Sequence, residues 1–181
     1  AMGREGARKL EPIEEESDPA KVGGLLYHRV WREAGRQTAS NFDARGRWLL
    51  VDDKGGVSND LARLLEARGG VCVERQDATG LRGIVYCRGL DAAVEPEAGT
   101  DVIAGHVERA VRGALEVVKE FDETPVWLVT AGAAVGLPSD GPVNVAQAPL
   151  WGLGRALAVE RPGGLGGLVD CDPASSSKEA A

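Results

Sequence analysis

The chain has 181 residues, 43% of them hydrophobic, which is enough for one globular domain with a buried core. Its formal charge of −7 and its lack of a Lys/Arg cluster argue against nucleic acid or an anionic membrane as the main partner. No apolar run approaches the roughly 18 residues of a membrane span, and no secretory leader is recognisable, so we expect a cytoplasmic protein.

Cysteine and histidine, the usual ligands of zinc, are few in this sequence. Its three cysteines, Cys72, Cys87 and Cys171, lie in separate apolar stretches and form no C-x-x-C pair. The two histidines, His28 and His106, have no second ligand four residues away. We therefore predict buried free thiols and no metal site.

Both ends of the chain differ in composition from its middle. Residues 1–23 are charged and lack apolar periodicity, which predicts a flexible linker, and the first three residues are interpreted as a remnant of recombinant expression. The domain is expected over residues 24–173, and residues 174–181 are expected to form a second linker. The domain should open with a half-buried edge strand over residues 25–31, in which Tyr27 and Trp31 share one side.

The first half of the domain reads as strand, glycine turn, helix and strand. An apolar strand is expected over residues 47–53, a turn over 54–58 and a helix over 59–70, which Gly69 should stop. Strands over 71–75 and 83–89 follow, joined by a short polar connection without a helix.

The second half alternates helices and strands. Apolar residues spaced by three and four predict a helix over 100–121, capped by Thr100 or Asp101. A buried strand over 125–133, a helix within 146–162 and a last strand over 166–172 complete the pattern. This order predicts an α/β fold: a truncated, Rossmann-like open sheet, mainly parallel, with helices on both faces.

The turn between the first strand and the first helix is where a dinucleotide-binding motif would lie. Such a site needs a glycine-rich turn that lets backbone amides approach a pyrophosphate. Here Gly55 and Gly56 are adjacent and no G-x-G-x-x-G occurs, while Asp52 and Asp53 would repel a phosphate. The turn is therefore interpreted as degenerate, with no cofactor, and we expect the carboxylate of Asp52 or Asp53 to bond to backbone or solvent.

Catalytic residues are not expected either. Tyr27 and Tyr86 each lack a lysine four residues on, so the reductase pair that protonates an alkoxide is missing. No G-x-S-x-G turn is present for Ser/His/Asp chemistry.

Five segments in chain order resemble one family: LLYHRVW, GRWLLVDDKGGVSNDLARLLEARGG, LRGIVYCRGLDA, PVWLVTAGA and AQAPLWGLGRALAVERPGGLGGLVD. They are similar to the structural subdomain of a ketoreductase from a modular polyketide synthase, over roughly residues 25–172. The resemblance implies two short-chain-reductase-like halves in the parent ketoreductase. This chain would be the truncated half without cofactor, and the second half would hold NADPH and the catalytic residues.

The helix within 146–162 is where the resemblance is most specific. Active halves carry Q-A-x-Y-x-x-x-N there, whereas this chain keeps Gln147 and Ala148 but has Leu150 and Gly154 at the Tyr and Asn positions. The resemblance therefore implies a packing helix, with Gly152 and Gly154 allowing another segment to approach Trp151. An interface with the catalytic half is expected at Tyr27, Trp31, Trp151, Gly152, Gly154 and Leu157.

Three functions remain open from the sequence. The first is a non-catalytic scaffold for the catalytic half, next to synthase domains such as the acyl carrier protein, enoylreductase, dehydratase or methyltransferase. The second is an interaction module within an inactive ketoreductase. The third is a free-standing reductase that binds NADPH at residues 52–58.

Overall fold

The computed structural model describes residues 42–95, 97–134 and 143–173. The expected strand at 25–31, with Tyr27 and Trp31, and both expected linkers lie outside these residues. The strands are β1 (Gly46–Val51), β2 (Gly70–Val73), β3 (Leu81–Tyr86), β4 (Val126–Ala131) and β5 (Leu165–Cys171). The helices are α2 (Val57–Ala67), α3 (Thr100–Glu120) and α4 (Ala148–Glu160), with short 3-10 turns η2 (Arg75–Asp77) and η3 (Arg88–Ala92).

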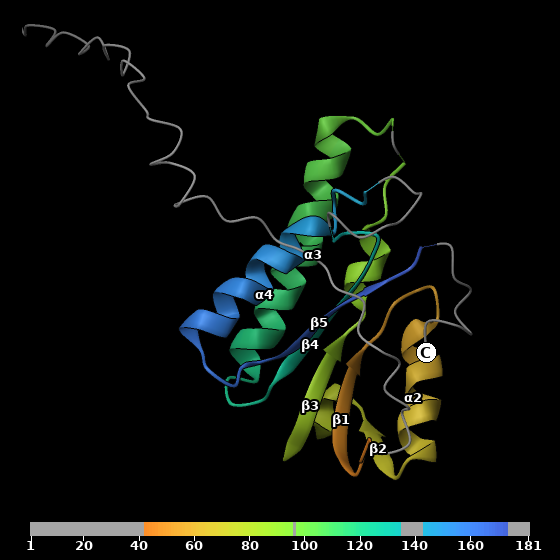
Figure 1. Ribbon diagram of the computed structural model, residues 1–181, viewed down its shortest axis with the longest axis vertical. Helices are drawn as coiled ribbons and strands as arrows, with labels where there is room; N and C mark the ends of the chain where they lie inside the picture. The colour runs from red at the N-terminus through yellow and green to blue at the C-terminus, as the bar shows by residue number, and fades with distance from the viewer. Residues whose placement is uncertain (1–41, 96, 135–142, 174–181) are drawn as a thin grey trace, which may run out of the picture. The chain divides into compact units, whose positions relative to one another are not determined.

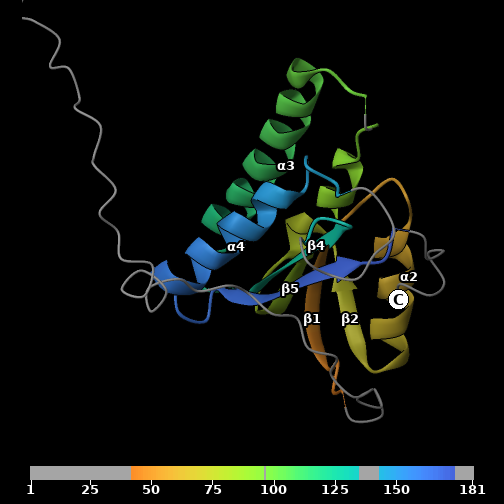
Figure 2. The ribbon, with the colours of Figure 1, turned by 45° about the horizontal axis from the view of Figure 1, so that its top comes forward.

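The five strands form one sheet in the order β2-β1-β3-β4-β5, and every pairing between them is parallel. The chain moves from β1 to one edge through α2, and toward the other edge through α3 and α4. Because such crossovers are right-handed, α2 lies on one face and α3 with α4 on the other (Figures 1 and 2). This confirms the predicted Rossmann-like fold with helices on both faces.

Alternation along the strands builds a core on each side of the sheet. Leu49, Ile84 and Leu128 belong to the larger cluster, which packs against α3 and α4. Their neighbours Trp48 and Val85 face α2 and join Leu65 in a smaller cluster. Strands buried on both faces explain why the sequence of β3 and β4 is apolar at successive positions.

Two tryptophans on the α2 face depend on glycines in the neighbouring strands. The rings of Trp48 and Trp127 lie 5.4 Å apart, centroid to centroid. A Cβ added to Gly83 would lie 2.4 Å from the Trp127 ring, and one added to Gly166 would lie 2.3 Å from it. These strand glycines therefore leave the room that the indole rings occupy.

The boundaries of several elements differ from the sequence predictions. The polar connection between β2 and β3 holds no α-helix, as predicted, but it contains the 3-10 turn η2, which was not predicted. The strand predicted over 83–89 ends at Tyr86, and η3 begins at Arg88. Gly69, with φ +84, follows the C-cap of α2 and confirms the predicted stop. The predicted cap of α3 was wrong, because the helix begins at Thr100 and its N-cap is Gly99, which offers no side chain.

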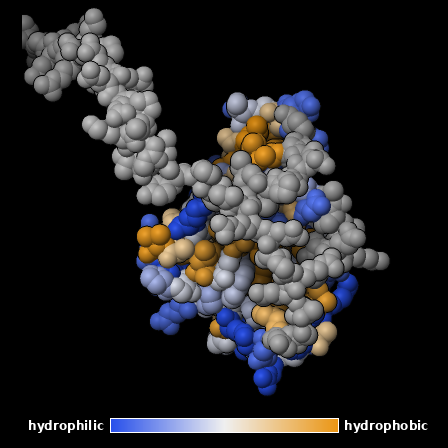
Figure 3. Space-filling view, in the orientation of Figure 1, coloured by the Kyte–Doolittle hydropathy of each residue, from blue (hydrophilic) through white to orange (hydrophobic). Residues whose placement is uncertain are grey.

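Apolar side chains are exposed on helices α3 and α4. In Figure 3 apolar residues are visible over the N-terminal end of α3 and the C-terminal end of α4. Val102 of α3 and Val159 of α4 are 52% and 81% exposed.

Among the described residues, the helices are too short or too polar to cross a bilayer, and His, Cys, Asp and Glu form no cluster that could hold a metal.

Candidate functional site at the carboxyl edge of the sheet

The strand order reverses between β1 and β3, and the carboxyl ends of these strands border a crevice of about 480 Å³. In open α/β sheets, ligands bind at such a reversal point. Acidic and basic side chains both line this crevice, together with His106 and two alanines: Asp52, Asp53, Lys54, Arg88, Asp91 and Arg109. The crevice is therefore where a nucleotide would be sought.

The N-terminus of α2, which would hold a pyrophosphate, already holds a carboxylate of the chain itself. Asp53 Oδ1 accepts a hydrogen bond from the amide of Ser58 at 2.8 Å, and Oδ2 accepts one from the amide of Val57 at 3.2 Å. The amide of Asp53 donates in return to Ser58 Oγ at 3.4 Å. Asp53 and Ser58 are both buried. The prediction that Asp52 or Asp53 would bond to backbone is confirmed for Asp53.

This arrangement keeps Asp53 ionised. Burial raises its pKa, but the hydrogen bonds from Ser58 and Val57 outweigh burial and hold the pKa below its usual value of 3.8. A fixed negative charge thus lies at the positive end of the α2 dipole. Any phosphate approaching these amides would have to displace a bonded carboxylate and overcome its charge.

The glycine turn is also tied to η3, the 3-10 turn that follows β3. Gly56 has φ +90, and the amide of Lys54 donates to Asp91 Oδ1 of η3 at 2.9 Å. A Cβ on Gly55 would lie 3.0 Å from Asp53 Oδ2. The adjacent glycines therefore serve a closed turn around Asp53 rather than an open cradle.

The helix α4 carries packing residues at the positions where the resemblance implies a tyrosine and an asparagine in active halves. Leu150 is fully buried, and a Cβ on Gly154 would lie 2.4 Å from Leu168 Cδ2 of β5. The close approach predicted from Gly154 therefore exists, but it is made by β5 of the same chain. Gly152 has open space around its Cβ position.

Polar groups near the start of α4 hold the carboxyl edge together. The buried side chain of Gln147 accepts from the amide of Ala131 at 2.8 Å and donates to the carbonyl of Leu90 at 3.3 Å. Trp151 Nε1 donates to Thr130 Oγ1 at 2.9 Å, and that hydroxyl donates to Asp170 Oδ1 at 2.6 Å. The network joins α4, β4 and β5.

The carboxylate of Asp170 also caps the loop after β4. Its oxygens accept hydrogen bonds from the amides of Ala133 at 3.0 Å and Ala134 at 2.8 Å. This group was not predicted from the sequence, although Thr130 and Asp170 are partners in the parallel register of β4 and β5. Only that register could have indicated the contact.

Tyr86, the described tyrosine, has no access to a substrate. Its side chain is fully buried, and its hydroxyl donates to the carbonyl of Ala110 at 3.0 Å. Burial raises the pKa of Tyr86 to about 12, which is unsuited to proton transfer near neutral pH. Cys87 is also fully buried, and burial raises the pKa of its thiol to about 12.

Comparison with known proteins assigns this geometry to a family. Residues 31–181 match the family described as the Rossmann fold domain of the polyketide synthase extender module SpnB. The chain belongs to this family.

Relatives and solved structures agree with that assignment. Erythronolide synthase EryA3 of Saccharopolyspora erythraea is 33% identical over 157 residues, which are 80% of this chain and 5% of EryA3. Polyketide synthase GfsB of Streptomyces halstedii is 36% identical over 95 residues, which are 50% of this chain and 2% of GfsB.

A C2-type ketoreductase from a modular polyketide synthase has a similar structure. It has a TM-score of 0.56 and 25% identity, covering 74% of this chain and 34% of that one. This chain is thus a ketoreductase-like Rossmann domain of a modular polyketide synthase, and it spans about one third of the ketoreductase that it resembles.

The residues expected to contact the other part of a ketoreductase fall into three groups. Tyr27 and Trp31 lie outside the described residues. Gly154 and Leu157 are buried against the chain's own core, so they offer no free surface. Trp151 is partly exposed and Gly152 exposed, so the available part of the expected interface is the flank of α4 that carries them.

Proposed function

We propose that this domain is a non-catalytic scaffold that docks onto and stabilises the NADPH-dependent catalytic half of a polyketide synthase ketoreductase, which reduces β-ketoacyl thioesters. The observation that carries the proposal is the carboxylate of Asp53 at the N-terminus of α2. A dinucleotide pyrophosphate would need the same two amides. The chain fills this position with its own negative charge, which favours a structural role.

The helix α4 supports the same role. A catalytic helix exposes a tyrosine and an asparagine to the substrate, whereas Leu150 and Gly154 face the chain's core. Tyr86 is withdrawn into that core as well. These residues stabilise packing and offer no group for proton transfer.

The catalytic half is proposed as the partner because the chain covers only 34% of the ketoreductase chain that it resembles. Neighbouring synthase domains, including the acyl carrier protein, would then lie along the same polypeptide. Within this proposal the flank of α4 with Trp151 and Gly152 is one surface available to that partner.

Titration with NADPH separates the scaffold from a free-standing reductase. Tryptophan fluorescence reports on binding, because Trp48, Trp127 and Trp151 lie in or beside the sheet. The scaffold role predicts no saturable change, with an active catalytic half as the positive control. A saturable change that disappears when Lys54 or Arg88 in the crevice is replaced by alanine would support the reductase instead.

A further inference from the structure

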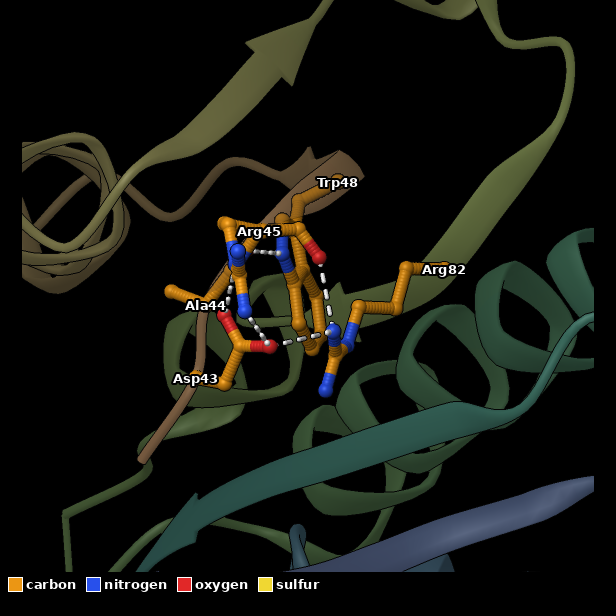
Figure 4. Close-up of polar contacts among 5 residues, drawn as sticks. All are labelled: Asp43, Ala44, Arg45, Trp48 and Arg82. Atoms are coloured by element: carbon orange, nitrogen blue, oxygen red, sulfur yellow. Dashed lines mark hydrogen bonds and ion pairs between the residues drawn. The ribbon is translucent and has the colours of Figure 1, made fainter. Parts of the chain in front are cut away.

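Arginine side chains gather at the amino end of the sheet, although the chain as a whole carries a formal charge of −7. Arg45 precedes β1, Arg47 lies in β1 and Arg82 lies in β3. In the described part of the chain, Asp43 is the carboxylate that pairs with this group, 2.9 Å from Arg45 Nε and 4.0 Å from Arg82 Nη1 (Figure 4). Three guanidinium charges against one carboxylate leave a local surplus of two positive charges.

Other arginines of the domain are neutralised one by one. Each of four pairs with a carboxylate of its own: Arg63 with Asp60, Arg75 with Glu120, Arg112 with Glu108 and Arg161 with Asp122. Asp43 instead serves a group of arginines. Hydrogen bonds from Arg45 lower the pKa of Asp43 to about 2 and keep it ionised, but it supplies a single negative charge.

Backbone carbonyls, which carry no net charge, hold two of these guanidinium groups in place. Arg47 Nε donates to the carbonyl of Thr79 at 2.9 Å, and its Nη2 donates to that of Asp77 at 2.6 Å. Arg82 Nη1 donates to the carbonyl of Arg45 at 2.7 Å. A guanidinium has five N–H donors, so in the described part of the chain donors remain on both groups. These side chains are fixed without being neutralised, which reduces the entropy that a ligand would cost them.

The backbone is irregular where it places Arg82. Trp48 of β1 pairs with Gly83, and the residue before Trp48 pairs with Leu81. The register skips Arg82, which is therefore an extra residue, as in a β-bulge, and bulges re-aim a side chain. The guanidinium carbon of Arg82 lies over the indole of Trp48, 5.9 Å from the ring centroid. Gly46, with φ +128, leaves room for it, because a Cβ there would lie 2.9 Å from Arg82 Cβ.

An exposed aromatic ring adjoins the arginines. Phe42 is 54% exposed, and its ring lies 6.4 Å, centroid to centroid, from the same Trp48 ring that Arg82 covers. Arginine and aromatic side chains are enriched in protein–protein interfaces and among their hot spots. We call this surface, formed by Phe42, Arg45, Arg47 and Arg82, the arginine surface.

We propose that the arginine surface binds an acidic segment of a partner protein, whose carboxylates pair with the guanidinium groups and whose apolar side chain covers Phe42. Guanidinium groups match carboxylates in two-point pairing, and the exposed phenylalanine ring offers an apolar contact that a free anion would not use. Nucleic acid is also anionic, but the chain's charge of −7 repels a long polyanion, whereas a short acidic segment meets only the local surplus.

The arginine surface lies away from the carboxyl edge of the sheet. Arg47 and Arg82 are near the amino ends of β1 and β3, whereas Trp151 bonds to Thr130 near the carboxyl end of β4. Because the strands are parallel, these positions lie at opposite ends of the sheet. The inference therefore goes beyond the scaffold function and names a second surface with a second partner.

A synthetic peptide of glutamates around one leucine is the probe, and the same peptide with glutamine for each glutamate is its control. Fluorescence anisotropy of the labelled peptides measures their binding to the whole chain. We expect saturable binding of the glutamate peptide that weakens as salt is added, because salt screens exposed charges. The glutamine peptide should bind about tenfold more weakly or less.

Two variants with the same change in net charge locate the site. Arg45 has a side chain 80% exposed, and Arg155 is an exposed arginine of α4 outside the arginine surface. Arg45→Glu should raise the dissociation constant of the glutamate peptide about tenfold or more, and Arg155→Glu should raise it about twofold at most. Phe42→Ala, which changes no charge, should raise it about threefold or more. Circular dichroism checks that all three variants are folded.

Three results would overturn the inference. The first is no saturable binding of the glutamate peptide, or equal binding by wild type and the Arg45→Glu and Phe42→Ala variants. The second is tighter binding of a DNA duplex than of the glutamate peptide, which would assign the surface to nucleic acid. The third is displacement of the bound peptide by the separately produced catalytic half, which would assign the surface to that half. The first two results leave the scaffold role standing, because neither measurement involves the catalytic half.

Discussion

Asp53 shows how a single side chain can decide the chemistry of a site. Its carboxylate bonds to the first amides of α2 and is paired reciprocally with Ser58. Any polar side chain at this position could cap the helix, but only an ionised one also opposes the approach of a phosphate. The residue therefore stabilises the fold, and in the proposed scaffold role the same bonds would oppose a nucleotide phosphate.

Replacing Asp53 by Asn tests the role of its charge. We expect Asp53→Asn to lower the free energy of unfolding at pH 7 by about 1–3 kcal/mol, because the amide oxygen can accept only one of the two hydrogen bonds, its NH2 group would face a backbone amide, and the interaction of the charge with the dipole is lost. The neighbouring Asp52 is exposed, and Asp52→Asn should change stability by less than about 0.5 kcal/mol. Urea unfolding of the three proteins gives these differences.

The pH dependence of that difference has a defined sign. Because the folded pKa of Asp53 is lower than the usual 3.8, the stabilisation by its charge is present above 3.8 and is lost as the pH falls through the folded value. The gap between wild type and Asp53→Asn should therefore close in acid. A gap that stays constant from pH 7 to well below 3.8 would show that the charge contributes nothing.

At the scale of elements, the contact of α4 with β5 requires a glycine at one of the two glycine positions of that helix and not at the other. Gly154 gives room to Leu168, whereas Gly152 faces open space. The sequence showed two glycines in a helix but not which strand lies beside each, so both were assigned to an interface. The close packing of α4 on the sheet accounts for Gly154 alone.

The same substitution at these two positions should have opposite effects. Gly152→Ala should raise the free energy of unfolding by about 0.5–1 kcal/mol through helix propensity. Gly154→Ala gains the same propensity but forces Leu168 to move, and overpacking of this kind costs about 1–3 kcal/mol. Thermal melts of both variants check the prediction. A stabilising Gly154→Ala would mean that α4 does not pack this closely on β5.

The paired tryptophans on the α2 face give a second prediction for the packing of elements. A methyl group at Gly83 would lie within 2.8 Å of both indole rings, and rigid rings cannot yield as an aliphatic chain does. We expect Gly83→Ala to cost about 1–3 kcal/mol and to reduce the near-UV circular dichroism of the tryptophans. Gly105→Ala in α3, whose nearest neighbour would be the end of Arg109 at 3.4 Å, should leave that spectrum unchanged.

Most elements of the fold could be predicted from periodicity, because the apolar spacing of α3 and the continuous apolar runs of β3 and β4 have few alternatives. Features set by tertiary geometry could not. The N-cap of α3 is Gly99, which carries no capping side chain to recognise. The hydrogen bond from Trp151 to Thr130 and the one from Thr130 to Asp170 depend on the placement of α4 and on strand register. At the candidate site, the degenerate glycine turn could be predicted because its residues are adjacent in the sequence. The crevice beside it could not, because its lining comes from separate segments that only the fold brings together.

In the part of the chain that the structure describes, helices α3 and α4 cover one face of the sheet, while α2 covers only part of the other face. Domains of this kind bury the uncovered part of a sheet against another element, because open apolar surface on a central sheet is unfavourable in water. The proposed scaffold role is consistent with this asymmetry. A self-sufficient reductase would instead need an open nucleotide site, which Asp53 occupies.

The most direct test of the scaffold role is a thermal melt of this chain with and without the catalytic half in trans. A partner present at a hundredfold excess over its dissociation constant stabilises by about 2.7 kcal/mol. For a chain of this size we expect the midpoint of unfolding to rise by about 5–10 °C. An unchanged midpoint at saturating concentrations of the catalytic half would contradict the account.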